Sequence, residues 1–407
     1  MRTRTWCVAA ALACLPRLAA AQTVLSEADA LTRLSADSPR VRAIRSTVEV
    51  TRAESVAAAA RWPNPRFTFN RESVAGVTEN MFLVTQPLPV TGRRGLELDA
   101  SAALVAASQQ RADDEIRHVR AALRRAYADL VAAQLRETET TASRDRLRAL
   151  AEVLARRESA GDAAGYDRLR AEREVIELEA DLTTARVDRA RAQGLLAGFF
   201  APSTDPAALV VAVAPAPRAT LPPVEEFVAS AERTLPELAA LKHEVEASEF
   251  AIRAAGRRPI PEPEIVAGTK SSNVGGGDVG GVFSVHVAVP LFDRAKPETT
   301  LAQARRAQSE ARLAAVQSSL RAEVAALRAI VVERRQAADS YRASTATSAN
   351  QLERIAQVSY DAGERGILEL VDAYRNSGAS RLRLVALDAA ARQAEIELEL
   401  VSGWEIR

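Results

Sequence analysis

The most extended feature of the chain is a helical pattern of apolar positions in two long intervals. Residues 96–160 and 298–362 contain neither glycine nor proline, and each interval is 65 residues long. A continuous helix of that length spans about 98 Å, far more than a compact domain needs. Within the intervals, apolar side chains recur in steps of three and four residues, which places them on one stripe of a helix. They are Ile116, Val119, Leu123, Tyr127 and Leu130, and then Leu320, Val324, Leu327 and Val331.

Alternation with a period of two residues precedes each long interval and predicts two pairs of strands. The pairs lie at about 65–71 and 79–88, and at about 263–270 and 281–291. In the last strand one face carries apolar side chains and the other carries small or polar ones; the apolar ones are Phe283, Val285, Val287 and Val289. This alternation is typical of a membrane β-barrel strand and equally of a half-buried hairpin. The strands alone leave both structures open.

The elements recur because the chain consists of two similar halves. Gln86-Pro87-Leu88 corresponds to Val289-Pro290-Leu291, 203 residues later, and Ala160-Gly161-Asp162 corresponds to Ala362-Gly363-Glu364, 202 residues later. We therefore predict a leader at 1–21, a first repeat at 22–200 with its long helix at about 94–160, a proline-rich linker at 201–223, and a second repeat at 224–407 with its long helix at about 295–362.

The first 21 residues have the pattern of a secretory signal. Arg2 and Arg4 precede an apolar run, and Ala19-Ala20-Ala21 supplies the small residues of a cleavage site. Both cysteines, Cys7 and Cys14, fall inside this segment, and whether Cys14 accepts a lipid is left open. Because no later run of 18 apolar residues exists, we expect no transmembrane helix.

Composition and charge exclude several classes of function. The chain has 54 Lys and Arg against 53 Asp and Glu, a net charge of +1, which gives no electrostatic basis for nucleic-acid binding. The glycines at 275, 277 and 280 fit a dinucleotide fingerprint by letter, but a strand follows them instead of the required helix. The three histidines lack neighbouring ligands at metal-binding spacing. We expect no enzyme, no cofactor and no metal centre.

The signal peptide, the two halves and the order strand–strand–long helix resemble the TolC-like outer-membrane efflux proteins. The resemblance is carried by Asn64-Pro65, by Gln86-Pro87-Leu88, by Val289-Pro290-Leu291-Phe292 and, most specifically, by the run from Tyr360 to Ala373. In addition, Trp62-Pro63-Asn64-Pro65 and Thr91-Gly92-Arg93-Arg94 look like the heavy-metal (cobalt–zinc–cadmium) resistance branch.

Membership of this family implies a mainly α protein with a small β part. In a homotrimer, four strands per protomer would give a twelve-stranded barrel in the outer-membrane lipid, continued by a long-helix α-barrel in the periplasm. The implied function is an exit duct that passively conducts substrates, heavy-metal cations among them, delivered by an inner-membrane efflux pump and a periplasmic adaptor. Two alternatives stay open: a duct for drugs or other small molecules, and a periplasmic coiled-coil adaptor or structural protein.

The resemblance also implies roles for residues at the periplasmic end. These are an aperture of Asp167, Tyr360 and Arg365, an acidic ring of Glu369 and Asp372, and two adaptor-contact turns at Gly161 and Gly363. Because Glu369 and Asp372 are three positions apart, they share one helix face independently of the resemblance. The resemblance also implies a further basic residue in the last helix, as another partner at the aperture. The equivalent position here is Asp388, so this basic partner is either missing or supplied by Arg381 or Arg383.

Overall fold

The computed structural model describes residues 24–59, 63–161, 165–213, 219–289, 292 and 294–405. The predicted leader with both cysteines therefore lies outside the described residues. The same holds for four residues of the motifs named above, which are Trp62, Asp162, Pro290 and Leu291.

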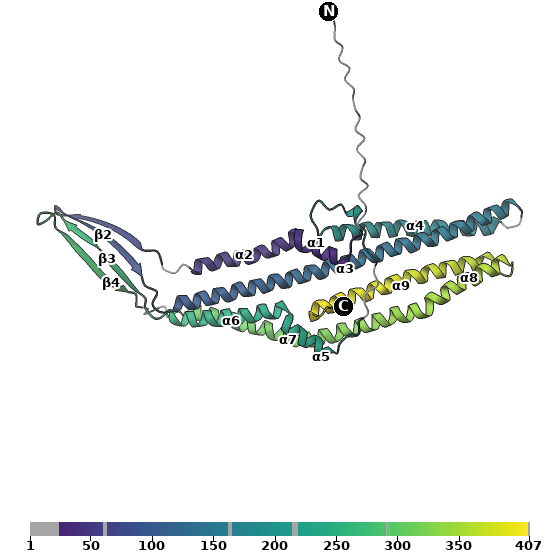
Figure 1. Ribbon diagram of the computed structural model, residues 1–407. Helices are drawn as coiled ribbons and strands as arrows, with labels where there is room; N and C mark the ends of the chain where they lie inside the picture. Colours follow the sequence, from purple (N-terminus) through teal and green to yellow (C-terminus); the bar gives the residue numbers. More distant parts are fainter. Residues whose placement is uncertain are drawn as a thin grey trace, which may run out of the picture.

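The molecule is elongated, with a small sheet at one end and helical hairpins at the other (Figure 1). The first half contains α1 (Glu27–Asp37), α2 (Pro39–Ala59), β1 (Arg66–Val74), β2 (Val77–Pro87), α3 (Arg93–Ser159), α4 (Gly165–Ala197) and the short η1 (Pro206–Ala208). The second half contains α5 (Val224–Thr234), α6 (Pro236–Arg257), β3 (Pro263–Ser272), β4 (Val279–Val287), α7 (Lys296–Tyr341), η2 (Arg342–Ala346), α8 (Thr347–Asp361) and α9 (Ile367–Ser402). The order of elements is thus repeated, and the fold is mainly α with a small β part, as predicted.

The helix α3 is long because its interior contains no residue that ends a helix. It begins after Gly92, whose φ is +71°, and ends before Gly161, whose φ is +85°. Both values lie in the left-handed region that glycine adopts without steric cost. None of the described helices has an apolar stretch of the length needed to cross a bilayer.

The second long interval differs from the first, although we predict one helix for both. Residues 296–361 are helical throughout, but the five residues of η2 form a π-helical turn. Serine hydroxyls near this turn donate to backbone carbonyls four residues earlier: Ser344 to Ser340 at 2.7 Å and Ser348 to Ser344 at 2.8 Å. Such hydrogen bonds compete with the regular helical pattern, and π-turns often mark functional positions in helices.

The four strands form one antiparallel sheet in the order β1-β2-β3-β4. Ala75 and Gly76 join β1 to β2 with φ values of +48° and +82°, the geometry of a tight two-residue hairpin turn. A longer connection with three glycines joins β3 to β4. The fourth strand ends at Val287, earlier than the predicted 291, because the partner of Val287 is Pro263, the first residue of β3.

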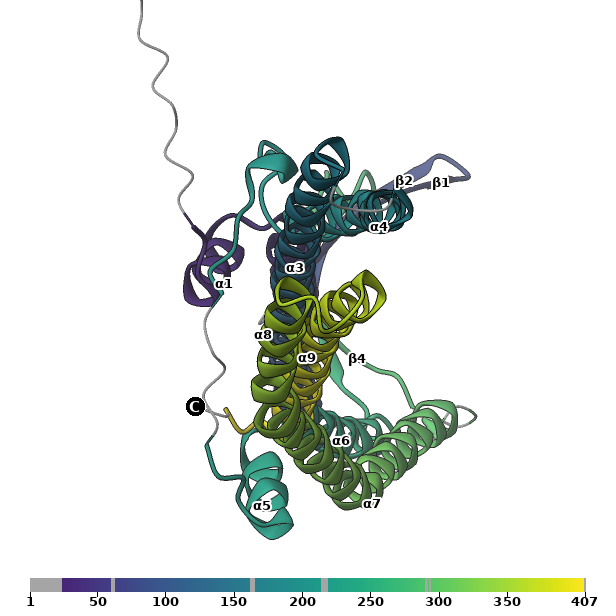
Figure 2. The same cartoon turned by 90° about the vertical axis from the view of Figure 1, so that its right-hand side faces the viewer.

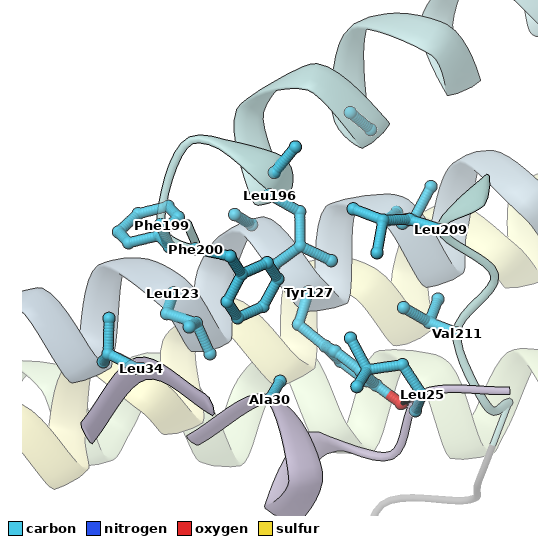
Figure 3. Close-up of a cluster of buried hydrophobic side chains, with 14 of the residues drawn as sticks. Leu25, Ala30, Leu34, Leu123, Tyr127, Leu196, Phe199, Phe200, Leu209 and Val211 are labelled. Atoms are coloured by element: carbon cyan, nitrogen blue, oxygen red, sulfur yellow. Dashed lines mark hydrogen bonds between the residues drawn. The ribbon is translucent and has the colours of Figure 1, made fainter. Parts of the chain in front are cut away.

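Buried apolar side chains hold the helices together in three main clusters along the molecule. In the first, shown in Figure 3, Leu123 and Tyr127 of α3 pack among residues from α1, from α4 and from the segment after η1. The Tyr127 hydroxyl donates to the carbonyls of Leu25 and Ala212, at 3.0 Å each. The predicted apolar stripe of α3 therefore faces α1, α2 and α4.

The other two clusters lie on the second repeat and at the far end. The second joins α5, α7 and α9 through residues such as Phe227, Val324 and Leu398. The third includes Leu154 of α3 and Leu370 of α9. Viewed along the molecule, the long helices form an arc, and α1 and α5 lie on its outer side (Figure 2).

Candidate functional sites at the two ends of the molecule

One face of the sheet is apolar and exposed. Directly paired residues share a face, and the register places Phe69 opposite Phe82 and Ala267 opposite Phe283. The rings of Phe69 and Phe82 are 4.7 Å apart between centroids. The apolar residues of this face are Phe67, Phe69, Phe82, Val84, Ile265, Ala267, Phe283, Val285 and Val287. A patch of this kind on a soluble surface would be costly, so the face is built for an apolar environment.

The opposite face of the sheet is polar and carries ion pairs. Arg66 and Glu264 approach to 2.6 Å, and Lys270 and Glu79 approach to 2.7 Å on neighbouring strands. His286 lies directly opposite Glu264. The four strands contain 9, 11, 10 and 9 residues. Strands of about 9–11 residues are long enough to cross a bilayer when tilted.

The helices α3 and α8, which end just before Gly161 and Gly363, both end on the side of the molecule opposite the sheet (Figure 1). Each glycine has a positive φ, +85° and +73°, and its amide donates to a carbonyl three residues earlier. The structure thus brings the two sequence-predicted adaptor-contact turns to the same end of the molecule.

Tyr360 is partly buried near these turns and contacts α3. The guanidinium of Arg157 lies 5.8 Å from the centre of its ring. Burial raises the pKa of Tyr360, and the nearby carboxylates of Asp167 and Asp361 raise it further against the effect of Arg157. Tyr360 therefore stays protonated at neutral pH. Two of the three predicted aperture residues, Tyr360 and Asp167, lie within electrostatic reach of one another.

The third predicted aperture residue, Arg365, follows the same turn, and its backbone amide donates to the carbonyl of Ser359 at 3.3 Å. Its side chain is exposed. Glu369 and Asp372 are also exposed on the first turns of α9, and Asp372 accepts a hydrogen bond from Asn376 at 3.0 Å. All three side chains are thus accessible to a partner or to solvent.

A cluster around Glu353 joins α3, α8 and α9, and sequence reasoning missed it. The Glu353 carboxylate accepts hydrogen bonds from Ser377 at 2.6 Å and from Arg146 and Arg381 at 3.3 Å each. Arg381, one suggested replacement for the family's basic partner, is therefore bound to Glu353. No sequence signal could reveal this cluster, because Arg146 and Glu353 are 207 positions apart.

Asp388, where the family's basic partner falls, has an ion pair of its own. Arg342 in η2 donates to both of its carboxylate oxygens, at 2.6 and 2.8 Å. A second long-range pair, Glu174 with Arg375 at 3.6 Å, joins α4 to α9. The charges at this end therefore connect helices from both repeats.

Residues 228–403, most of the second repeat, match the sequence profile of the family described as outer membrane efflux protein. No curated protein matches the chain in sequence. The chain is nevertheless similar to solved structures along nearly all of its length, which confirms the fold that the resemblance implies.

Three solved structures illustrate the likeness. A membrane protein from Pseudomonas aeruginosa aligns with a TM-score of 0.77 at 20% identity, covering 93% of each chain. The outer membrane protein VceC from Vibrio cholerae aligns with a TM-score of 0.74 at 15% identity, over 93% of this chain and 96% of that one. The CmeC outer membrane channel of Campylobacter jejuni aligns with a TM-score of 0.77 at 12% identity, over 93% of this chain and 85% of that one. The chain therefore has the same fold as these three proteins.

Proposed function

We propose that three copies of this chain form an exit duct across the outer membrane. The observation that carries the proposal is the contrast between the two faces of the sheet. One face exposes only apolar and neutral side chains over its central rows, whereas the other carries the pairs Arg66–Glu264 and Lys270–Glu79. In a closed barrel the first face would contact lipid and the second would line a water-filled lumen.

One chain cannot form that barrel, because the outer strands β1 and β4 each pair on one side only in the described sheet. Unpaired backbone groups are not tolerated in lipid, so every edge has to be closed. Three copies would supply twelve strands. The family and the solved channels support this assembly and an outer-membrane location.

The helical part would extend the duct into the periplasm. We place the pump-facing end at the turns of Gly161 and Gly363, opposite the sheet. There a periplasmic adaptor would contact the turns and connect the duct to an inner-membrane pump. Asp167, Tyr360 and Arg365 would surround the aperture at that end, and the exposed carboxylates of Glu369 and Asp372 would face its pore.

We propose heavy-metal cations as the cargo, because threefold repetition of Glu369 and Asp372 would gather six carboxylates at a narrow point. Rings of carboxylates favour cations in a pore. The motifs at 62–65 and 91–94, similar to the heavy-metal resistance branch, support the same cargo. In this view the duct performs no chemistry, and the pump selects the substrate.

Two experiments test the proposal. Purified protein from outer-membrane fractions should run as a heat-modifiable trimer and should give discrete conductance steps in planar bilayers. A protein found only in the soluble periplasm would instead support the adaptor alternative. A deletion strain should become sensitive to cobalt, zinc or cadmium salts; sensitivity to organic drugs alone would assign the duct to small-molecule efflux.

A further inference from the structure

We propose that the helical wall holds a binding site for a monovalent organic cation with an apolar body. The site is a pocket between α3, α6 and α7 with a volume of about 540 Å³. Pockets of this size that combine apolar walls with a few charged groups are typical binding sites for small molecules. All of the residues that line the pocket belong to one chain, so binding does not depend on the proposed trimer.

One part of the pocket lining is apolar. Ala240 and Leu241 of α6 are 2% and 8% exposed, and Ala315 and Val316 of α7 belong to the same lining. The small side chains of the two alanines leave room for an apolar ligand beside the helices. Such a ligand gains free energy by leaving water, so the apolar part would contribute to its affinity.

The charged side chains of the lining have a negative balance. Two guanidinium groups, those of Arg111 and Arg312, are outnumbered by four carboxylates, which belong to Asp114, Glu115, Glu237 and Glu244. With His118 neutral, the lining therefore carries a net charge of −2. A cleft lined mainly by one sign of charge concentrates ions of the opposite sign, so this pocket favours cations.

Two of the four carboxylates are already compensated within the chain. Glu244, which is 8% exposed, forms an ion pair with Arg111, and the Ser309 hydroxyl donates to its carboxylate at 3.4 Å. These contacts connect α6 with α3 and with α7 around the pocket. Asp114 accepts a hydrogen bond from Arg117 at 2.7 Å.

The other two carboxylates, Glu115 and Glu237, have no ion-pair partner among the described residues. Partial burial raises the pKa of Glu237, and the nearby carboxylate of Asp114 raises it further against the effect of Arg117 and His118. A raised carboxyl pKa means that the surroundings disfavour the negative charge, and an added cation would relieve this cost. We therefore expect Glu115 and Glu237 to bind the charged group of the ligand.

An organic cation fits this lining better than a bare metal ion does. Among the residues that the structure describes, no three carboxylate, histidine or cysteine side chains are close enough together to hold a metal ion. An organic cation needs no such set of ligands, because its apolar body can lie on Ala315 and Val316 while its charge meets the carboxylates. The pocket thus differs in position and in ligand from the carboxylates of Glu369 and Asp372.

The pocket lies toward the inner side of the arc of helices. His118 and Tyr127 of α3 are nine positions apart, which is about two and a half helical turns, so they point in opposite directions. Tyr127 packs in the cluster that contains Ala30 and Leu34 of α1, and α1 lies on the outer side of the arc (Figure 2). His118, which lines the pocket, therefore points inward. In the proposed duct, a bound cation would lie on the wall of the lumen.

Fluorescence titration of the full-length protein with ethidium, a flat organic cation, tests the site. We expect the double variant Glu115→Gln with Glu237→Gln to bind ethidium about tenfold more weakly than the unaltered protein, because it lacks both uncompensated charges. The matched control Asp113→Asn with Glu246→Gln removes two exposed carboxylates of the same helices that do not line the pocket. The control should bind ethidium as tightly as the unaltered protein.

A second pair of variants tests the place of binding without changing any charge. Ala315→Trp should fill the pocket and abolish saturable ethidium binding, whereas Ala314→Trp, at an exposed position outside the lining, should leave it intact. Circular dichroism verifies that each variant keeps its helical content.

Three results would overturn the site: no saturable binding of ethidium by the unaltered protein, equal affinity in the pocket variants and their controls, or displacement of ethidium by equimolar zinc or cobalt salts. Native gels report trimer formation separately. Ethidium binding by a chain that forms no trimer would overturn the duct and leave the pocket standing.

Discussion

Neighbouring residues of β4 face different surroundings, and single substitutions distinguish them. Phe283 lies in the middle of the strand on the apolar face and is 72% exposed, whereas Ser284 points to the polar face. A charged residue at the bilayer midplane on the lipid side costs about 2–4 kcal/mol. We expect Phe283→Arg to reduce the yield of heat-modifiable trimer strongly and Ser284→Arg to reduce it little. Similar losses for both would contradict the assignment of the two faces.

A buried network of charges predicts a dependence of stability on pH. Glu27 of α1 contacts Arg392 at 2.9 Å and Arg124 at 2.5 Å. Burial raises the pKa of Glu27, but the two guanidinium groups together outweigh it and hold the pKa below its ordinary value. Because its pKa is lower in the folded protein, the charged Glu27 stabilises the fold at pH values above the ordinary carboxyl pKa of about 4.3. This stabilisation is lost as the pH falls through the lowered pKa.

We therefore expect Glu27→Gln to destabilise the protein by roughly 1–3 kcal/mol at pH 7 and by much less near pH 3. Thermal unfolding followed by circular dichroism at both pH values measures the difference. Glu49→Gln is the matched control, because Glu49 pairs with Arg52 on an exposed helix surface. An effect of Glu27→Gln that is equal at both pH values would argue against the charged contact.

At the scale of elements, the π-helical turn η2 distinguishes the two long helices. Arg342 in this turn binds Asp388 of α9 through two hydrogen bonds and Asp339 through one. The groups are partly exposed, so the pair contributes little to global stability. We expect Asp388→Asn to increase hydrogen exchange in α8 several-fold without lowering the melting temperature measurably. Asp339→Asn should increase this exchange less. If the amides of α8 exchanged equally fast in the two variants, Asp388 would not be the residue that restrains α8.

Most elements could be predicted from the sequence, because local patterns specify them. The absence of glycine and proline predicted the long helices, and period-two alternation predicted both hairpins and the face of Phe283. The turn η2 could not be predicted, since neither glycine nor proline marks it in the sequence. The end of β4 at Val287 could not be predicted either, because a strand ends where its partner ends, at Pro263 in this case.

The candidate sites were less predictable than the helices and strands, because local patterns do not specify contacts between distant parts of the chain. The turns at Gly161 and Gly363 were predicted because a left-handed backbone favours glycine. The cluster around Glu353 was not, because it joins residues of three helices and leaves no local pattern. The resemblance pointed to Tyr360 but not to Arg157, which contacts its ring. Sequence thus predicts what the backbone does locally and misses the charges that meet only after folding.

At the scale of the whole molecule, the acidic side chains at the far end predict how the proposed duct would conduct. We expect Glu369→Gln with Asp372→Asn to reduce cation selectivity and to weaken block by multivalent cations in planar bilayers. Glu397→Gln, another exposed carboxylate on α9, should leave both properties unchanged. Unaltered selectivity in the double variant would remove these residues from the pore.

Arg365→Ala tests the aperture separately. If the exposed Arg365 binds a neighbouring copy and holds the aperture closed, its removal should raise single-channel conductance severalfold. Arg375→Ala is a useful comparison, since Arg375 already pairs with Glu174 within the chain. If the conductance rose in Arg375→Ala but not in Arg365→Ala, the contact that keeps the aperture closed would lie within one subunit.

The two hairpins of the sheet end in loops of different length, and in the proposed trimer this would have a practical consequence at the cell surface. The turn of Ala75 and Gly76 fixes the pairing of β1 with β2, so an inserted residue would disturb the alignment of both strands. The glycine-rich connection between Ser272 and Val279 is longer; its Asn273 is hydrogen-bonded to Thr78 and Gly76 of the first hairpin, whereas the three glycines at 275–277 leave room for an insertion. A trimer would display three such loops around its mouth, and a short epitope inserted there should be bound by antibody on intact cells.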